Sequence, residues 1–156
     1  MRKTRPMAQL PHLDQEMNRL NEMLGGTAML PPPCFTSMHA EFTAYESRSA
    51  LTVEIPVAET MLNPVGAMQG GFITAAIDNT MGPLSYLALR SAASTLDIHT
   101  QFVRSVPAGE RLTVTARVVS MGPISLVMEA EVRNSRGKLV ASATANALAI
   151  RKEPRP

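Results

Sequence analysis

The segment from Asn63 to Asp78 combines residue types that could do chemistry on a carbonyl group. It reads NPVGAMQGGFITAAID, so a turn-rich stretch ends in Gly70-Gly71 and leads directly into an apolar helical pattern. The first N–H groups of a helix lack intrahelical partners and carry partial positive charge, so they can hold an oxyanion or a polarised carbonyl. Glycine at this point lets a substrate approach the backbone closely.

Asp78 places a carboxylate in this apolar helical pattern, seven residues after Gly71. Its helical neighbours, among them Phe72, Ile73 and Ile77, are apolar on most faces, which predicts that the helix and its carboxylate are buried. A buried carboxylate costs several kcal/mol unless something compensates it. A catalytic role would account for such a residue.

The spacing between Gly71 and Asp78 has a consequence for assembly. Seven residues at about 1.5 Å each place the two groups roughly 10 Å apart along the helix axis, too far for one carbonyl carbon to touch both. Two such helices packed antiparallel across a two-fold axis bring Gly71 of one chain beside Asp78 of the other, and two-fold dimers are the commonest oligomers. The alternative is that Asn63-Pro64 and Gly70-Gly71 only form turns, and that Asp78 caps a further helical segment.

The amino-acid composition limits the classes of protein to which this chain can belong. A chain of 156 residues with 45% hydrophobic content suits one globular domain, and a net charge of +2 is too small to indicate a nucleic-acid partner. The single cysteine, Cys34, cannot form an internal disulfide, and the three histidines show no metal-ligand spacing. The basic N-terminus lacks the apolar run of a secretory signal, and no stretch is long enough to span a membrane. We expect a cytoplasmic protein with no metal, redox or other cofactor.

Hydrophobic periodicity indicates an α+β fold. Apolar residues recur at helical spacing from Leu13 to Leu24, which predicts an amphipathic accessory helix that ends at Gly25-Gly26. From Thr36 the period changes to two, first in a hairpin up to Val57 and then in four strands, over residues 95–103, 111–120, 124–133 and 138–150. A row of alternate alanines from Ala141 to Ala149 suits a sheet that packs closely on the central helix. Gly82-Pro83 predicts a kink or break in that helix.

These features together resemble one known family, the PaaI-type hotdog-fold acyl-CoA thioesterases. The resemblance rests on Asn63-Pro-Val-Gly66, Gly70-Gly71, Asp78 and the later segment FVRSVPAGERLTVTARVVSMG, and it covers roughly residues 35–150. It implies a hotdog fold, in which a curved antiparallel sheet wraps a long central helix. The division it suggests is an extension over 1–34 with the accessory helix, a hotdog domain over 35–150 and a tail over 151–156.

The resemblance also implies roles for individual residues. Asp78 is implied to be the general base or nucleophile, the N–H of Gly71 or of its neighbour Gly70 polarises the thioester carbonyl, and Asn63 positions water or substrate. Thr95, or Ser94 as the alternative, is expected to orient the carboxylate or water. The family's usual motif is His-Gly-Gly, and Gln69 stands where that histidine is expected; an amide can donate a hydrogen bond but cannot transfer a proton at neutral pH.

Substrate contacts are less specific in the sequence. Coenzyme A carries phosphates, so the cations at strand ends and in turns are candidates to bind them, namely Arg104, Arg133, Arg136 and Lys138, although any one of them could be an ordinary surface charge. Met68 could line an acyl pocket together with Met61, Met81 and Leu84, or all four could be core residues.

The sequence therefore predicts a homodimer or homotetramer that hydrolyses an acyl-CoA, with coenzyme A as part of the substrate. The alternative is a hotdog protein that binds acyl-CoA without turnover, as a sensor or carrier. A dehydratase would want an acid/base histidine beside its carboxylate, and Gln69 argues against it.

Overall fold

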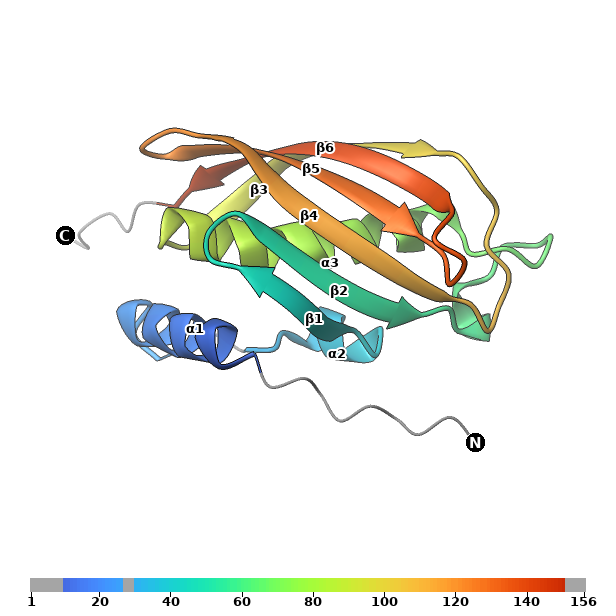
Figure 1. Ribbon diagram of the computed structural model, residues 1–156, viewed down its shortest axis with the longest axis horizontal. Helices are drawn as coiled ribbons and strands as arrows, with labels where there is room; N and C mark the ends of the chain where they lie inside the picture. The colour runs from blue at the N-terminus through green and yellow to red at the C-terminus, as the bar shows by residue number, and fades with distance from the viewer. Residues whose placement is uncertain (1–9, 27–29, 151–156) are drawn as a thin grey trace.

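One long helix lies against the concave side of a curved six-stranded sheet in the computed structural model, which describes residues 10–26 and 30–150 (Figure 1). The sheet wraps the helix, and two N-terminal helices lie beside them (Figure 1). In chain order the elements are α1 (Pro11–Met23), α2 (Pro33–Ser37), β1 (Glu41–Glu46), β2 (Ala50–Pro56), η1 (Glu59–Met61), α3 (Gly70–Leu89), β3 (Ala93–Phe102), β4 (Arg111–Met121), β5 (Ser125–Arg133) and β6 (Leu139–Ala149). The expected α+β architecture, including the accessory helix, is confirmed.

The strands pair antiparallel throughout, in the order β1-β2-β4-β5-β6-β3. Hairpins join β1 to β2, β4 to β5 and β5 to β6, whereas α3 leads from β2 across to β3 at the far edge of the sheet and the chain then crosses back from β3 to β4 beside β2. Within the described residues β3 is therefore an edge strand, hydrogen-bonded to β6 alone. An unpaired strand edge offers a row of backbone groups to a second chain.

The core lies between the sheet and α3. Strand β5 alternates strictly between exposed and buried side chains, as its sequence predicts for a sheet with one covered face. Four members of the alanine row in β6, Ala141, Ala143, Ala145 and Ala147, are buried in the same cluster as Ile77 of α3. Their small side chains let the helix approach the sheet closely.

Two local predictions differ from the structure. The break considered at Gly82-Pro83 is absent, since helix α3 continues to Leu89 with Pro83 inside it; proline takes away only one N–H donor. Residues 36–40 do not begin a strand: α2 ends at Ser37, and His39 turns the chain with a φ of +50° before β1 starts at Glu41. The last proline of the run before Cys34 opens this short helix, since proline is favoured in a first helical turn.

Helix α1 is fastened to the hairpin of β1 and β2 by a polar cluster. The hydroxyl groups of Tyr45 and Ser47 both donate hydrogen bonds to the carboxylate of Glu16. Burial would raise the pKa of Glu16, but these two hydrogen bonds outweigh it and the pKa is lowered. These hydrogen bonds hold the accessory helix at β1, the strand at the edge of the sheet opposite β3.

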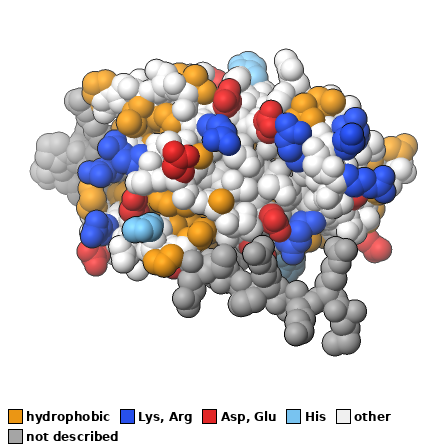
Figure 2. Space-filling model, in the orientation of Figure 1, with side chains coloured by type: hydrophobic (Ala, Val, Ile, Leu, Met, Phe, Trp, Pro, Cys, Tyr) orange, Lys and Arg blue, Asp and Glu red, His pale blue; other side chains and the backbone are white. Residues whose placement is uncertain are grey.

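Surface charge is mixed. On the face shown in Figure 2, basic and acidic side chains are interspersed, with no continuous basic surface. None of the helices in the described residues combines the length and the apolar character that a membrane span needs. The boundary expected between residues 34 and 35 falls inside α2, and the expected tail over 151–156 lies outside the described residues.

Candidate active site

Helix α3 runs along the edge strand β3, and three contacts at four-residue spacing on the helix join them. Gly70 lies against the ring of Phe102, the hydroxyl of Thr74 donates to that of Thr100 over 3.1 Å, and the hydroxyl of Thr95 donates to Asp78 Oδ1 over 3.2 Å. The spacing follows from the helix, in which residues four apart lie on one face. The sequence-predicted pair of Asp78 and Thr95 is therefore brought together.

A β-bulge turns Thr95 toward the helix. Between Thr95 and Asp97 the pairing of β3 with β6 shifts by one residue, so Thr95 lies opposite buried Ala147 while Asp97 lies opposite exposed Asn146. Without the bulge, Thr95 would share the outer face with Asp97, because side chains alternate along a regular strand. Ser94, the alternative to Thr95, is exposed and has no hydrogen bond to Asp78 within the described residues.

Asp78 itself differs from its prediction. Its side chain is exposed in the single chain, not buried, because Gly71, Ala75 and Asp78 follow one another along the side of α3 that the sheet leaves open. The apolar residues predicted to enclose it, Ile73 and Ile77, instead face the core. Phe72 is also partly open, with 38% of its surface exposed. Any desolvation of this carboxylate must come from a bound molecule or a second chain.

The N-terminus of α3 is capped by its own preceding residue. Gln69 is the N-cap, and its Oε1 accepts the N–H of Phe72 over 3.3 Å. Its carboxamide folds over Gly71, so closely that a β-carbon added to Gly71 would lie 2.7 Å from Gln69 Oε1. Among the described residues no acceptor is bound to Gln69 Nε2 or to the N–H of Gly71. Two donors therefore stand together at this helix end.

Asn63 has a structural role in the turn before the helix. Its Oδ1 accepts the N–H groups of Val65 and Ala67 over 3.1 and 3.0 Å, and its own N–H donates to the carbonyl of Ala67 over 2.7 Å. These bonds close the loop in the way that asparagine favours in turns. The side-chain Nδ2 is left over as a donor, because no described residue accepts from it.

Met68 lies in the core and not in a substrate pocket of the single chain. Only 4% of its surface is exposed, and Met61, Met81 and Leu84 are equally buried in the same cluster. In the single chain all four residues therefore pack in the core, and their contact with an acyl group stays a prediction.

The candidate cations gather at the end of the molecule where α3 begins. The N–H groups of Val103 and Arg104 both donate to the carbonyl of Val140, which places the end of β3 beside the turn that carries Arg136 (Figure 1). Two hydrogen bonds from Ser135 lower the pKa of Glu110 and hold this turn against the loop before β4. Arg104 donates to the carbonyl of Leu139, and both arginines are exposed.

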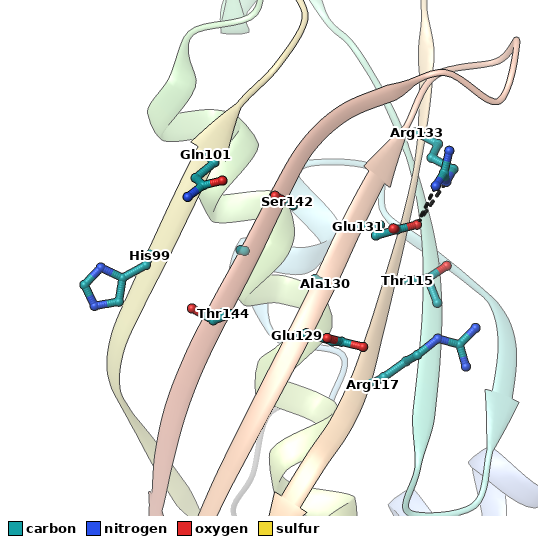
Figure 3. A pocket seen from close by; sticks show the side chains of 11 residues that line it. His99, Gln101, Thr115, Arg117, Glu129, Ala130, Glu131, Arg133, Ser142 and Thr144 are labelled. Atoms are coloured by element: carbon teal, nitrogen blue, oxygen red, sulfur yellow. Dashed lines mark hydrogen bonds and ion pairs between the residues drawn. The ribbon is translucent and has the colours of Figure 1, made fainter.

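A separate hollow lies on the outer face of the sheet, away from α3. Figure 3 shows it lined by polar side chains of β3 to β6, with α3 behind the sheet and His99 pointing outward. Its charges are partly paired, since Arg133 donates to Glu131 over 2.7 Å. Of the residues that the sequence offered for the site, only the candidate cation Arg133 lines it. We therefore place the candidate active site at the junction of α3 and β3.

The comparisons with known proteins point to one family. The family model described as the thioesterase superfamily matches residues 65–141, a range that begins just before α3 and includes β3, β4 and β5. Over this range the chain is similar to the thioesterase superfamily. No curated protein matches the chain.

Solved structures of PaaI-type proteins match most of the chain. The Escherichia coli PaaI protein from the phenylacetic acid degradation operon superposes with a TM-score of 0.76 at 21% identity, over 89% of this chain and 96% of that one. A putative thioesterase from Ralstonia eutropha JMP134, a phenylacetic acid degradation-related protein, gives 0.73 at 29% identity, over 84% and 99%. A Streptococcus mutans UA159 protein solved with acetyl-CoA bound gives 0.68 at 25% identity, over 74% and 91%. The predicted hotdog fold and the PaaI-like resemblance are thereby confirmed.

Proposed function

We propose that this protein hydrolyses acyl-CoA thioesters. The observation that carries the proposal is the alignment of Asp78, held by Thr95, with the open helix end at Gly71 along one exposed side of α3. The match of residues 65–141 to the thioesterase superfamily and the likeness to a protein solved with acetyl-CoA support the substrate class. A carboxylate and an oxyanion site are the two parts that thioester hydrolysis requires.

The site is proposed to form between two copies of the chain. Gly71 and Asp78 are roughly 10 Å apart on one helix, and both are exposed. The neighbouring edge of β3 is unpaired within the described residues and carries exposed apolar side chains, with Leu96 61% and Val103 55% exposed. Two β3 edges joined about a two-fold axis would lay the two α3 helices side by side and antiparallel. Such a dimer would supply the enclosure that Asp78 lacks in one chain.

In the proposed reaction, water cleaves the C–S bond of the thioester. Asp78 accepts a proton from the attacking water, whose oxygen bonds to the thioester carbon, while the partner's helix end holds the developing oxyanion. Collapse of that intermediate breaks the C–S bond and leaves the free acid. The expelled thiolate of coenzyme A takes up the proton that Asp78 accepted, which gives the free thiol and restores the carboxylate. Direct attack by the carboxylate, followed by hydrolysis of the anhydride, gives the same products.

Other hydrogen-bond donors near this site would bind further parts of the substrate. Gln69 Nε2 and the N–H of Gly71 lie at the same helix end without an acceptor among the described residues, so both would donate to the carbonyl oxygen. Asn63 Nδ2 is a further donor on the adjoining loop. Arg104 and Arg136 would bind the phosphates of coenzyme A at that end of the molecule, where both are exposed.

The direct test is release of free thiol from short, medium, long and aryl acyl-CoAs by the purified protein. We expect turnover of at least one class, with equal amounts of acid and thiol formed. Binding of acyl-CoA by calorimetry with no thiol release from any of them would favour a sensor or carrier instead.

Exchange of Gln69 for glutamate separates its two roles. The carboxylate of Gln69→Glu would still supply a capping oxygen to Phe72, and its charge suits a helix N-terminus, so the melting temperature should stay the same or rise. The same variant loses the amide donor and puts negative charge beside the oxyanion, so kcat/KM should fall by about 10²-fold. Undiminished activity of Gln69→Glu would show that this side chain only caps the helix.

A further inference from the structure

Phe102 is an exposed aromatic side chain that the proposed reaction has not used. It ends β3 with 55% of its surface exposed, although large aromatic side chains gain most from burial. One side of its ring lies against Gly70: a β-carbon on that glycine would lie 2.9 Å from Phe102 Cζ. The ring is thus seated at the first residue of α3, next to the open N–H of Gly71.

Phe102 also stands between this helix end and the cations. The next two residues, Val103 and Arg104, both donate their N–H groups to the carbonyl of Val140, directly before which lies the turn with Arg136 and Lys138. From the helix end outward, the order is therefore an open N–H, an aromatic ring and a group of positive charges. Coenzyme A has the same order of chemistry from its thioester outward: carbonyl, uncharged pantetheine arm, phosphates.

We propose that Phe102 binds the pantetheine arm of the substrate, an inference that rests on the proposed function. The ring would give the methyl and methylene groups of the arm an apolar surface, with Gly70 leaving the ring room to lie flat against the helix. Because every acyl-CoA carries the same arm, Phe102 contributes equally to all acyl groups and sets no chain-length preference.

The test compares Phe102→Ala with wild type on three thioesters of one acyl group, carried on coenzyme A, on pantetheine and on N-acetylcysteamine. The last of these lacks most of the arm. We expect kcat/KM to fall at least about tenfold for the first two and no more than about twofold for the third, mainly through KM. The fall should be the same for short and long acyl groups. Arg104→Ala should weaken only the coenzyme A thioester, because pantetheine has no phosphates.

Val119→Ala is the matched control, since Val119 is about as exposed as Phe102, at 57%, but lies on β4, which two strands separate from β3. A loss with Phe102→Ala that grows with acyl length, or that is as large for the N-acetylcysteamine thioester, would overturn the inference. So would conversion of Phe102→Ala to a monomer in light scattering, because the ring would then belong to a subunit contact.

The role of Phe102 can be tested even if the protein does not hydrolyse acyl-CoA. If wild type releases no thiol from any substrate, titration of coenzyme A and of pantetheine into both proteins by calorimetry still tests whether Phe102 binds the pantetheine arm. Equal affinities of wild type and Phe102→Ala would overturn the inference there, and an affinity for both ligands that is at least about tenfold lower in the variant would uphold it.

Discussion

Replacement of Asp78 by asparagine should lower kcat for thioester hydrolysis by about 10³-fold and leave the affinity for acyl-CoA within a few-fold of wild type. Asparagine has the same shape and keeps an oxygen that can accept the hydrogen bond from Thr95, so the geometry between α3 and β3 is retained. What it loses is the capacity to take a proton from water or to attack the thioester. Single-turnover thiol release and calorimetric binding would measure the two quantities separately.

The matched control is Asp97→Asn. Asp97 lies two residues beyond Thr95 on the same strand, but the bulge places it on the outer face, where it accepts hydrogen bonds from Asn146. Its replacement should change kcat by less than about twofold, because it lies outside the site. If Asp78→Asn retains turnover within tenfold of wild type, the carboxylate is neither base nor nucleophile, and the proposed mechanism is wrong.

Replacement of Gly71 by valine should lower kcat/KM by about 10²-fold, the usual effect of losing one oxyanion donor. The new side chain would occupy the position that the carboxamide of Gln69 now holds, at 2.7 Å from its oxygen. The amide would then be displaced from the N–H of Phe72, and the approach to the N–H of Gly71 would be covered. Steady-state kinetics with the best acyl-CoA provide the measurement.

Gly71→Ala gives a graded comparison, because a methyl group only requires the flexible end of Gln69 to move. Its activity should lie between those of wild type and Gly71→Val. Circular dichroism and the melting temperature establish that α3 still forms in both. A folded Gly71→Val with wild-type kcat/KM would contradict the assignment of this helix end as the oxyanion site.

Much of the architecture could be predicted because it follows from local periodicity. Alternation over residues 111–120 and 124–133 predicts β4 and β5 to within one residue at each end. The amphipathic spacing from Leu13 to Leu24 predicts α1. The N-terminus of α3 could be placed because glycine, with its preceding turn residues, marks a change in backbone conformation that few other sequences allow.

Features that depend on contacts distant in sequence could not be predicted in the same way. The bulge that directs Thr95 inward depends on the register between β3 and β6, which alternation along one strand does not reveal. Exposure of Asp78 depends on which side of α3 the sheet covers, and a helix that is apolar nearly all round does not indicate that side. Phe102 was missed because its neighbour Gly70 precedes it by 32 residues, and only the folded chain brings ring and glycine together.

The central claim is a thioesterase site shared between two chains, and subunit mixing tests it most directly. Asp78→Asn and Gly71→Val are each nearly inactive alone in this account, but a mixed dimer would contain one site with both residues intact. After random exchange half of the dimers are mixed, so thiol release should recover to about a quarter of the wild-type rate per chain. No recovery, once exchange has been verified by mass spectrometry of the intact dimers, would contradict the shared site.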